Sequence, residues 1–119
     1  MTQNIKELHT IEELEQALSN SANQPVLLFK HSLSCSISSR AFSEFESYLE
    51  KADPRISYNL ITVQTARSVS NEAASRLRID HESPQAILVR DGRGIWSASH
   101  FGITASTIDQ AIRSVQEVA

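Results

Sequence analysis

Apolar residues in this chain follow two spacings, one typical of helices and one typical of buried strands. Apolar positions that recur every third or fourth residue predict helices, whereas short continuous apolar runs between turn residues predict strands covered on both faces. The predicted order is helix 10–20, strand 25–30, helix 36–52, strand 56–63, a helix capped by Ser68, strand 85–90, strand 95–99 and a last helix capped near Thr104 or Ser106.

Capping and breaking residues set the helix boundaries. Thr10 with Glu13 fits a capping box at the start of the first helix. Asp53-Pro54 must follow the end of the second helix, because proline has no N–H to donate within it. The last helix carries an apolar stripe made of Ile108, Ala111, Ile112, Val115 and Val118.

The order α-β-α-β-α-β-β-α is that of a thioredoxin-like fold. Two strands joined by a helix should be parallel with a right-handed crossover, and Asp91-Gly92 predicts an antiparallel hairpin for the last two strands. Helices should then cover both faces of the sheet. We therefore expect an α/β protein with a single thioredoxin-like domain over residues 1–119 and a central mixed four-stranded sheet.

Composition narrows the classes of function. A chain of 119 residues with 40% hydrophobic and 21% charged residues suits one globular core, and a net charge of −3 gives no reason to expect nucleic acid or an anionic membrane as partner. The longest apolar run, 26-VLLF-29, is too short to cross a bilayer, and MTQNIKELHT lacks the pattern of an export signal. With one cysteine, no internal disulfide can form, and we expect a cytoplasmic protein whose thiol stays reduced.

The single cysteine, Cys35, stands in 30-KHSLSCSISSR-40, where a predicted strand leads into a predicted helix. Unpaired N–H groups and the helix dipole at such a position favour an anion, and the thiolate is the nucleophilic form of cysteine. Ser38 can donate a hydrogen bond to this thiolate, while Lys30 and His31 are candidates to add positive potential. Since position 38 holds no second cysteine, we predict exchange that stops at one mixed disulfide. An inert, buried thiol is the alternative.

Ser83-Pro84 directly precedes the third main strand. In a thioredoxin-like fold this loop adjoins the N-terminus of the active-site helix, and its proline is usually cis. The backbone groups beside such a proline form an edge on which an extended peptide or a small thiol can dock. The predicted site therefore has Cys35 and Ser38 as catalytic residues and, as substrate-binding residues, Ser34, Ser36, Ser83 and Pro84.

Three segments resemble one known family. The segment 34-SCSIS-38 is similar to the T-C-P-I-S active site of the monothiol bacilliredoxins, thioredoxin-like proteins of the bacillithiol system. The segments 81-HESPQAILVRDG-92 and 96-WSASHFGIT-104 resemble that family's loop–proline–strand region and its final strand and turn. The resemblance runs from the first helix to the end of the chain. Ser34 replaces the motif threonine, and Ser36 replaces its proline, which bears on the rigidity of the helix start and on the acidity of the thiol.

This resemblance implies an activity and its partners. The activity is removal of bacillithiol from S-bacillithiolated proteins, with Cys35 as the attacking residue and Pro84 as the loop proline. Bacillithiol is then a co-substrate, and no bound cofactor is expected. The implied partners are S-thiolated client proteins, together with a low-molecular-weight thiol or a thiol reductase that clears the mixed disulfide from Cys35.

Two metal-based interpretations stay open. Cys35 could bind zinc together with histidines that the predicted loops bring to the same end of the sheet, namely His31, His81 and His100. Alternatively, a monothiol glutaredoxin-like protein would share an iron–sulfur cluster through Cys35 and a small thiol. Zinc is not our expectation, because histidines at the surface or in structural roles are commoner than zinc ligands. The iron–sulfur cluster stays an alternative.

A non-enzymatic docking domain is a further alternative. It would use the Pro84 loop and the Cys35 end of the fold as its surface, with Trp96 and Phe101 as apolar contacts. A strand tryptophan is, however, more often a core residue.

Overall fold

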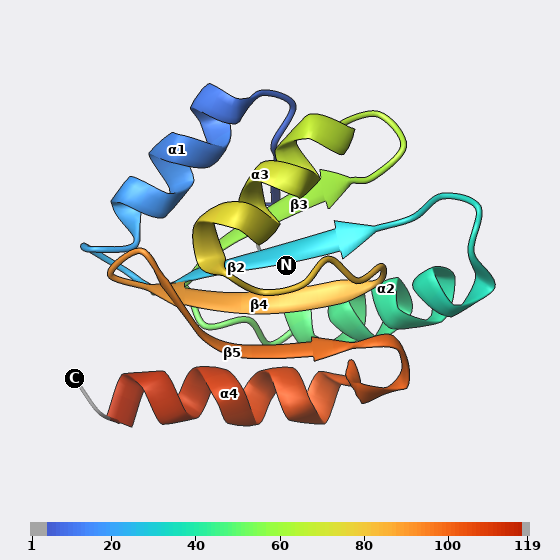
Figure 1. Cartoon of the computed structure of the whole chain (residues 1–119). Coiled ribbons are helices and arrows are strands. Elements are labelled where there is room, and N and C mark those ends of the chain that lie inside the picture. The colour runs from blue at the N-terminus through green and yellow to red at the C-terminus, as the bar shows by residue number, and fades with distance from the viewer. Residues whose placement is uncertain (1–4, 118–119) are drawn as a thin grey trace.

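The chain forms one mixed β-sheet with two helices on each face, as Figure 1 shows. This computed structural model describes residues 5–117, with side chains described through Val115. In chain order the elements are β1 (Ile5–Glu7), α1 (Ile11–Asn20), β2 (Val26–His31), α2 (Ser36–Leu49), β3 (Ser57–Thr62), α3 (Arg67–Leu77), β4 (Gln85–Arg90), β5 (Arg93–Ser99), the 3-10 turn η1 (His100–Gly102) and α4 (Ala105–Glu117).

The sheet confirms the predicted thioredoxin-like topology and adds one strand. Its strand order is β1-β3-β2-β4-β5, with β2 parallel to β3 and antiparallel to β4. The predicted hairpin joins β4 to β5, and its turn residues Asp91 and Gly92 have φ of 54° and 73°. Positive φ at both central positions is what a type I′ turn requires, which explains the Asp-Gly pair.

The expected four strands are five, because Ile5–Glu7 pairs in parallel with β3. This strand is three residues long and none of its residues is buried. Its single apolar side chain gives no alternating pattern to detect, and its pairing partner lies more than 50 residues away in the sequence. Sequence periodicity therefore had nothing by which to identify it.

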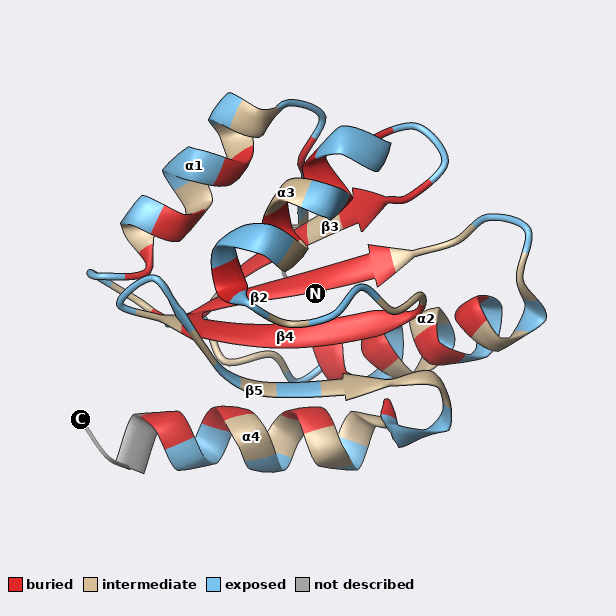
Figure 2. Cartoon of the chain, in the orientation of Figure 1, coloured by how far each residue is buried: buried red, intermediate tan, exposed pale blue. Residues whose placement is uncertain are grey.

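Two apolar clusters fill the space between the sheet and its helices, one on each face (Figure 2). Leu27 and Phe29 of β2 pack on the face covered by α2 and α4, whereas Val26 and Leu28 pack on the face covered by α1 and α3. The continuous apolar run of β2 thus serves both faces through the alternation of strand side chains. No helix in the described part of the chain is long and apolar enough to cross a membrane.

The helix starts agree with the sequence in three of four cases, including α2, which begins at Ser36 as predicted. The capping box of Thr10 and Glu13 is present, and Thr104 Oγ1 accepts the Thr107 N–H at 3.0 Å at the start of α4. The predicted cap at Ser68 is wrong, since α3 begins at Arg67 after Ala66, which places Ser68 inside the first turn. Val118, predicted to continue the stripe of α4, lies outside the described residues.

Candidate functional site

Cys35 is the N-cap residue of α2, directly after the loop that leaves β2. Its backbone is extended, with φ of −115° and ψ of 126°, and its carbonyl accepts the first helical hydrogen bond from Ser39 N–H at 3.1 Å. The thiol is partly exposed and makes no capping hydrogen bond. An N-cap side chain is the one best placed to accept from the free N–H groups of the first helical turn. The sulfur therefore stands where a thiolate can be stabilised.

The expected hydrogen bond from Ser38 to the sulfur is not formed in the described part of the chain. Its side chain is buried, and its hydroxyl accepts a hydrogen bond from the backbone N–H of Ser32 at 3.1 Å. No hydrogen bond joins Ser38 to Cys35 among the described residues. The bond that Ser38 does make joins the loop between β2 and α2 to the first turn of the helix.

Gln64 is a second support of this loop, and no pattern in the sequence indicates it. It follows β3, and its side-chain carbonyl accepts the Leu33 N–H at 3.0 Å. Its amide donates to the hydroxyls of Ser32 at 2.8 Å and Ser34 at 3.1 Å. A contact across about 30 residues of chain has no local signal, so only the parallel pairing of β2 with β3 reveals it.

Ser34 and Ser36 flank the thiol on the exposed side of the loop. The Ser34 hydroxyl is held by Gln64, whereas Ser36 is the first helical residue and its side chain is exposed. A first helical position tolerates proline, because its N–H has no partner within the helix. The replacement of the motif proline by Ser36 is therefore compatible with the same helix start.

Ser83-Pro84 lies at the same end of the sheet as Cys35. Figure 1 shows the β2–α2 loop, the loop before β4 and the η1 turn together at this end, opposite the β4–β5 hairpin. The Ser83–Pro84 peptide bond is cis, as expected for this position. Pro84 is buried and its carbonyl accepts the His100 N–H at 3.2 Å, while the buried Ser83 hydroxyl oxygen has no partner among the described residues.

Two large apolar side chains are exposed at this end. Leu33, two residues before Cys35, is 64% exposed, and Phe101 in η1 is 62% exposed. The Arg40 guanidinium of α2 lies 5.4 Å from the centre of the Phe101 ring, which ties the η1 turn to the active-site helix. Apolar exposure next to the thiol gives a partner molecule a surface to contact.

The histidines do not converge on Cys35. His31 packs against Phe42 with ring centres 4.8 Å apart, His81 lies beside Lys30, and His100 Nδ1 is 3.6 Å from a Glu82 carboxylate oxygen. Within residues 5–117, no three metal-ligating side chains come together. The candidate zinc ligands thus lie in three different surroundings.

Lys30 and His31 were candidates to add positive potential near the thiol, and the structure supports neither of them in that role. The Lys30 side chain is buried under α3, on the face of the sheet away from α2. Burial lowers the pKa of His31, against a smaller raising effect of Glu46, so the imidazole is neutral at pH 7. The first turn of α2, with Cys35 at its N-cap, remains as a source of positive potential for the thiol.

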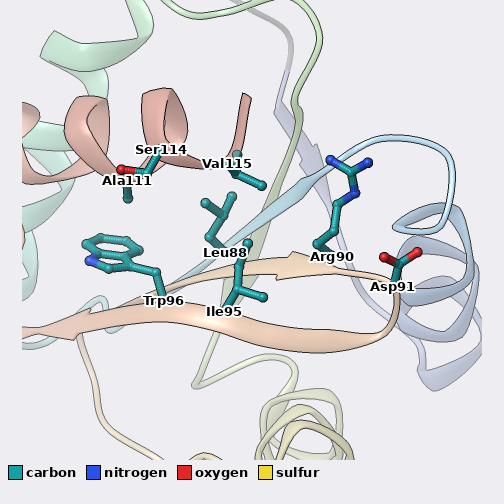
Figure 3. Close-up of a pocket in the computed structure, with 8 residues that line it drawn as sticks. All are labelled: Leu88, Arg90, Asp91, Ile95, Trp96, Ala111, Ser114 and Val115. Atoms are coloured by element: carbon teal, nitrogen blue, oxygen red, sulfur yellow. The ribbon is translucent and has the colours of Figure 1, made fainter. Parts of the chain in front are cut away.

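An apolar groove, shown in Figure 3, is lined by residues other than those around Cys35. It has a volume of about 550 Å³ between β4, β5 and α4, and Trp96, Leu88 and Val115 form its apolar wall. Arg90 and Asp91 border it at the β4–β5 hairpin, which lies at the opposite end of the sheet from the β2–α2 loop. Trp96 therefore does not contribute to the surface around the thiol, whereas Phe101 does.

Comparison with protein families gives one match over most of the chain. Residues 6–108 match the family described as "Monothiol bacilliredoxin BrxC". This range contains Cys35, Gln64, the Ser83-Pro84 loop and the η1 turn, so every part of the site described above lies within it.

Solved structures share the fold over nearly the whole chain. A proposed oxidoreductase with a thioredoxin fold is 30% identical, with a TM-score of 0.80 over 91% of this chain and 93% of that one. A thioredoxin from Trypanosoma brucei brucei is 13% identical, with a TM-score of 0.76 over 98% of this chain and 95% of that one. A poplar thioredoxin h mutant is 20% identical, with a TM-score of 0.75 over 98% of this chain and 85% of that one.

Proposed function

Because the chain belongs to the monothiol bacilliredoxin family, a family of thiol oxidoreductases with the thioredoxin fold, we propose that it removes bacillithiol from S-bacillithiolated proteins. The observation that carries this proposal is the position of Cys35. It is the only cysteine of the chain, it caps the N-terminus of α2, and its side chain makes no capping bond. A thiol so placed is free to react with a disulfide that approaches from solvent.

The proposed step is a thiol–disulfide exchange. The Cys35 thiolate attacks the bacillithiol sulfur of the client's mixed disulfide, a new S–S bond joins Cys35 to bacillithiol, and the client sulfur leaves as a thiolate that takes a proton from water. The number of disulfides is unchanged, so the step needs no external oxidant or reductant. The free N–H groups of the first turn of α2 stabilise the negative charge on the attacking sulfur.

Release of the adduct requires a second molecule. Position 38 holds a serine, whose hydroxyl is bound to Ser32 N–H, so the described site offers no second thiol to attack the Cys35 adduct. An outside thiol, or a reductase that supplies one, attacks the bacillithiol sulfur and leaves Cys35 as a thiolate again. No bound cofactor takes part in either exchange.

Binding of the client is proposed at the surface around the thiol. Ser83, the residue before the cis proline Pro84, provides backbone groups for an extended segment, while Leu33 and Phe101 provide exposed apolar area at the same end of the sheet. Ser34 and Ser36 are the sequence neighbours of Cys35, and we expect them to border the approach of an incoming thiol to its sulfur. Exposed apolar side chains here suit a protein client better than a small thiol alone.

The test compares two mixed disulfides of one client peptide. The reduced protein is mixed with the peptide carrying bacillithiol or, as a control, glutathione, and intact mass is measured for the wild type and Cys35→Ala. We expect a bacillithiol adduct on the wild type alone and slower transfer of glutathione. Transfer that persists in Cys35→Ala would refute the proposal, and equal transfer of both thiols would refute its specificity for bacillithiol.

A further inference from the structure

Lys30 is a fully buried cation at the end of an aliphatic row. It is the fifth residue of β2, its side chain is 0% exposed, and Val26 and Leu28 precede it on the same face of the sheet. Removing an ammonium group from water costs free energy unless polar partners replace the water. Burial accordingly lowers the pKa of Lys30 to about 8.

The partners of this ammonium are neutral. Lys30 Nζ donates to the Ser70 carbonyl of α3 at 3.1 Å and lies 3.3 Å from His81 Nδ1. The Ser70 hydroxyl is 3.2 Å from the same histidine nitrogen. No ion pair among the described residues includes Lys30, so a carboxylate does not compensate its charge. An apolar side chain of similar length would fill this space without the cost of desolvation.

Gln85 stands directly opposite Lys30 on the antiparallel strand β4, so both side chains point to the same face of the sheet. Its amide donates to the Asp80 carbonyl at 3.1 Å, and its side-chain carbonyl accepts the Glu82 N–H at 3.4 Å. Lys30 holds His81 between these two points. Two neighbouring buried side chains therefore anchor three consecutive loop residues, Asp80 to Glu82.

This anchored segment continues directly into Ser83 and Pro84. On its other side, His100 donates its N–H to the Pro84 carbonyl at 3.2 Å and places Nδ1 3.6 Å from the Glu82 carboxylate. The loop is thus held by two sets of contacts, one to the buried side chains of Lys30 and Gln85 and one to His100 of η1. Its position relative to Cys35 depends on both sets of contacts.

We propose that Lys30 is a positioning residue, whose buried ammonium holds the Asp80–Pro84 loop in place for an incoming disulfide at the cost of folding stability. This inference rests on the proposed exchange at Cys35, because it gives Ser83 and Pro84 a substrate to receive. It explains why a strand that is otherwise aliphatic on this face carries a charged residue at its end.

The protonation of His81 fits this role. Burial lowers the pKa of His81, the charges of Lys30 and Arg67 lower it further, and Glu82 opposes them. Arg67 belongs to α3, Lys30 to β2 and Glu82 to the loop itself, so all three elements around the imidazole contribute. A neutral imidazole can accept a hydrogen bond from Lys30 at Nδ1, whereas a protonated one would repel the ammonium.

The test compares Lys30→Met with Lys51→Met, which removes an exposed lysine beyond the end of α2. Three quantities are measured: transfer of bacillithiol from the client peptide, alkylation of Cys35 by iodoacetamide, and thermal stability. Transfer requires the loop, while iodoacetamide is too small to depend on it. We expect Lys30→Met to slow transfer about tenfold, because a small misplacement of a docked substrate is costly. The rate of alkylation should be unchanged. The melting temperature should be unchanged or higher.

Transfer at the wild-type rate in Lys30→Met would overturn the inference, and so would equal slowing of transfer and alkylation together with a lower melting temperature. Failure of the wild type and Lys51→Met to transfer bacillithiol would instead refute the proposed function. The His81 pKa, measured by NMR, tests the contact between Lys30 and His81 without any substrate. It should rise in Lys30→Met because the neighbouring ammonium is gone, and an unchanged value would overturn the anchor.

Discussion

The Ser38 hydroxyl accepts a hydrogen bond from the backbone N–H of Ser32 at 3.1 Å, in a position where Ser38 is fully buried. This bond joins the loop after β2 to the first turn of α2, with Cys35 between its two ends. Ser38 therefore supports the loop that carries the thiol. Its contribution to the chemistry can be measured separately from its contribution to stability.

Replacing Ser38 by alanine should lower stability more than it alters the chemistry. The partly buried Ser32 N–H would lose its acceptor, which typically costs about 1–3 kcal/mol in the free energy of unfolding. Urea unfolding measures this cost, with Ser43→Ala on the exposed face of α2 as control. The single bacillithiol adduct should still form. Lost adduct formation at unchanged stability would show instead that Ser38 acts on the sulfur.

Ser38→Cys should change the end point of the reaction. The new thiol can attack the mixed disulfide on Cys35, which releases bacillithiol and leaves an internal disulfide between positions 35 and 38. Intact mass should then fall from the adduct value to two hydrogens below that of the reduced variant. An adduct as persistent as in the wild type would contradict the view that position 38 decides where the exchange stops.

Gln64→Ala should loosen the loop without unfolding the protein. Gln64 makes three hydrogen bonds to Ser32, Leu33 and Ser34, all of them exposed. Bonds that water can replace contribute little net free energy, so we expect a loss of less than about 1 kcal/mol. Hydrogen exchange at the Leu33 amide should become faster and transfer slower. The control is Gln110→Ala, at an exposed position of α4, and equal behaviour of the two variants would contradict a support role.

The buried charge of Lys30 should appear in the pH dependence of stability. Its pKa is about 8 in the folded protein, against about 10.4 for a lysine in an unfolded chain. Between these values the unfolded state binds more protons, so the free energy of unfolding rises with pH, by on the order of 3 kcal/mol over the window. Lys30→Met should lack this rise. Parallel stability curves for the two proteins from about pH 7.5 to about pH 10.5 would show that the lysine is not desolvated.

The order of the eight main elements was predictable because each carries its own local pattern. The apolar run of β2, the capping box of Thr10 and Glu13, and the Asp91-Gly92 turn are all signals contained within a few residues. Cys35 at a helix N-terminus and the Ser83-Pro84 loop followed from this order. Apart from the cap at Ser68, these local signals placed the elements correctly.

Side-chain contacts between elements were not predictable, although the pairing of the main strands was. Lys30 was a candidate source of positive potential for the thiol, but the alternation of β2 directs its side chain to the opposite face, under α3. Gln64 reaches the active-site loop only because β3 ends beside β2, and Ile5–Glu7 is a strand only because β3 is its neighbour. The Ser38 hydroxyl was assigned to the sulfur from spacing alone, and spacing does not distinguish the two groups it could bind.

The most direct test of a monothiol exchange at Cys35 counts the thiols released per chain when no outside thiol is present. An excess of S-bacillithiolated peptide is added to the reduced protein, the freed peptide thiol is quantified, and peptide mapping locates the adduct. The account predicts one equivalent of freed thiol, one bacillithiol on Cys35, and no further turnover until a second thiol is added. No release, or repeated turnover without an added thiol, would contradict it.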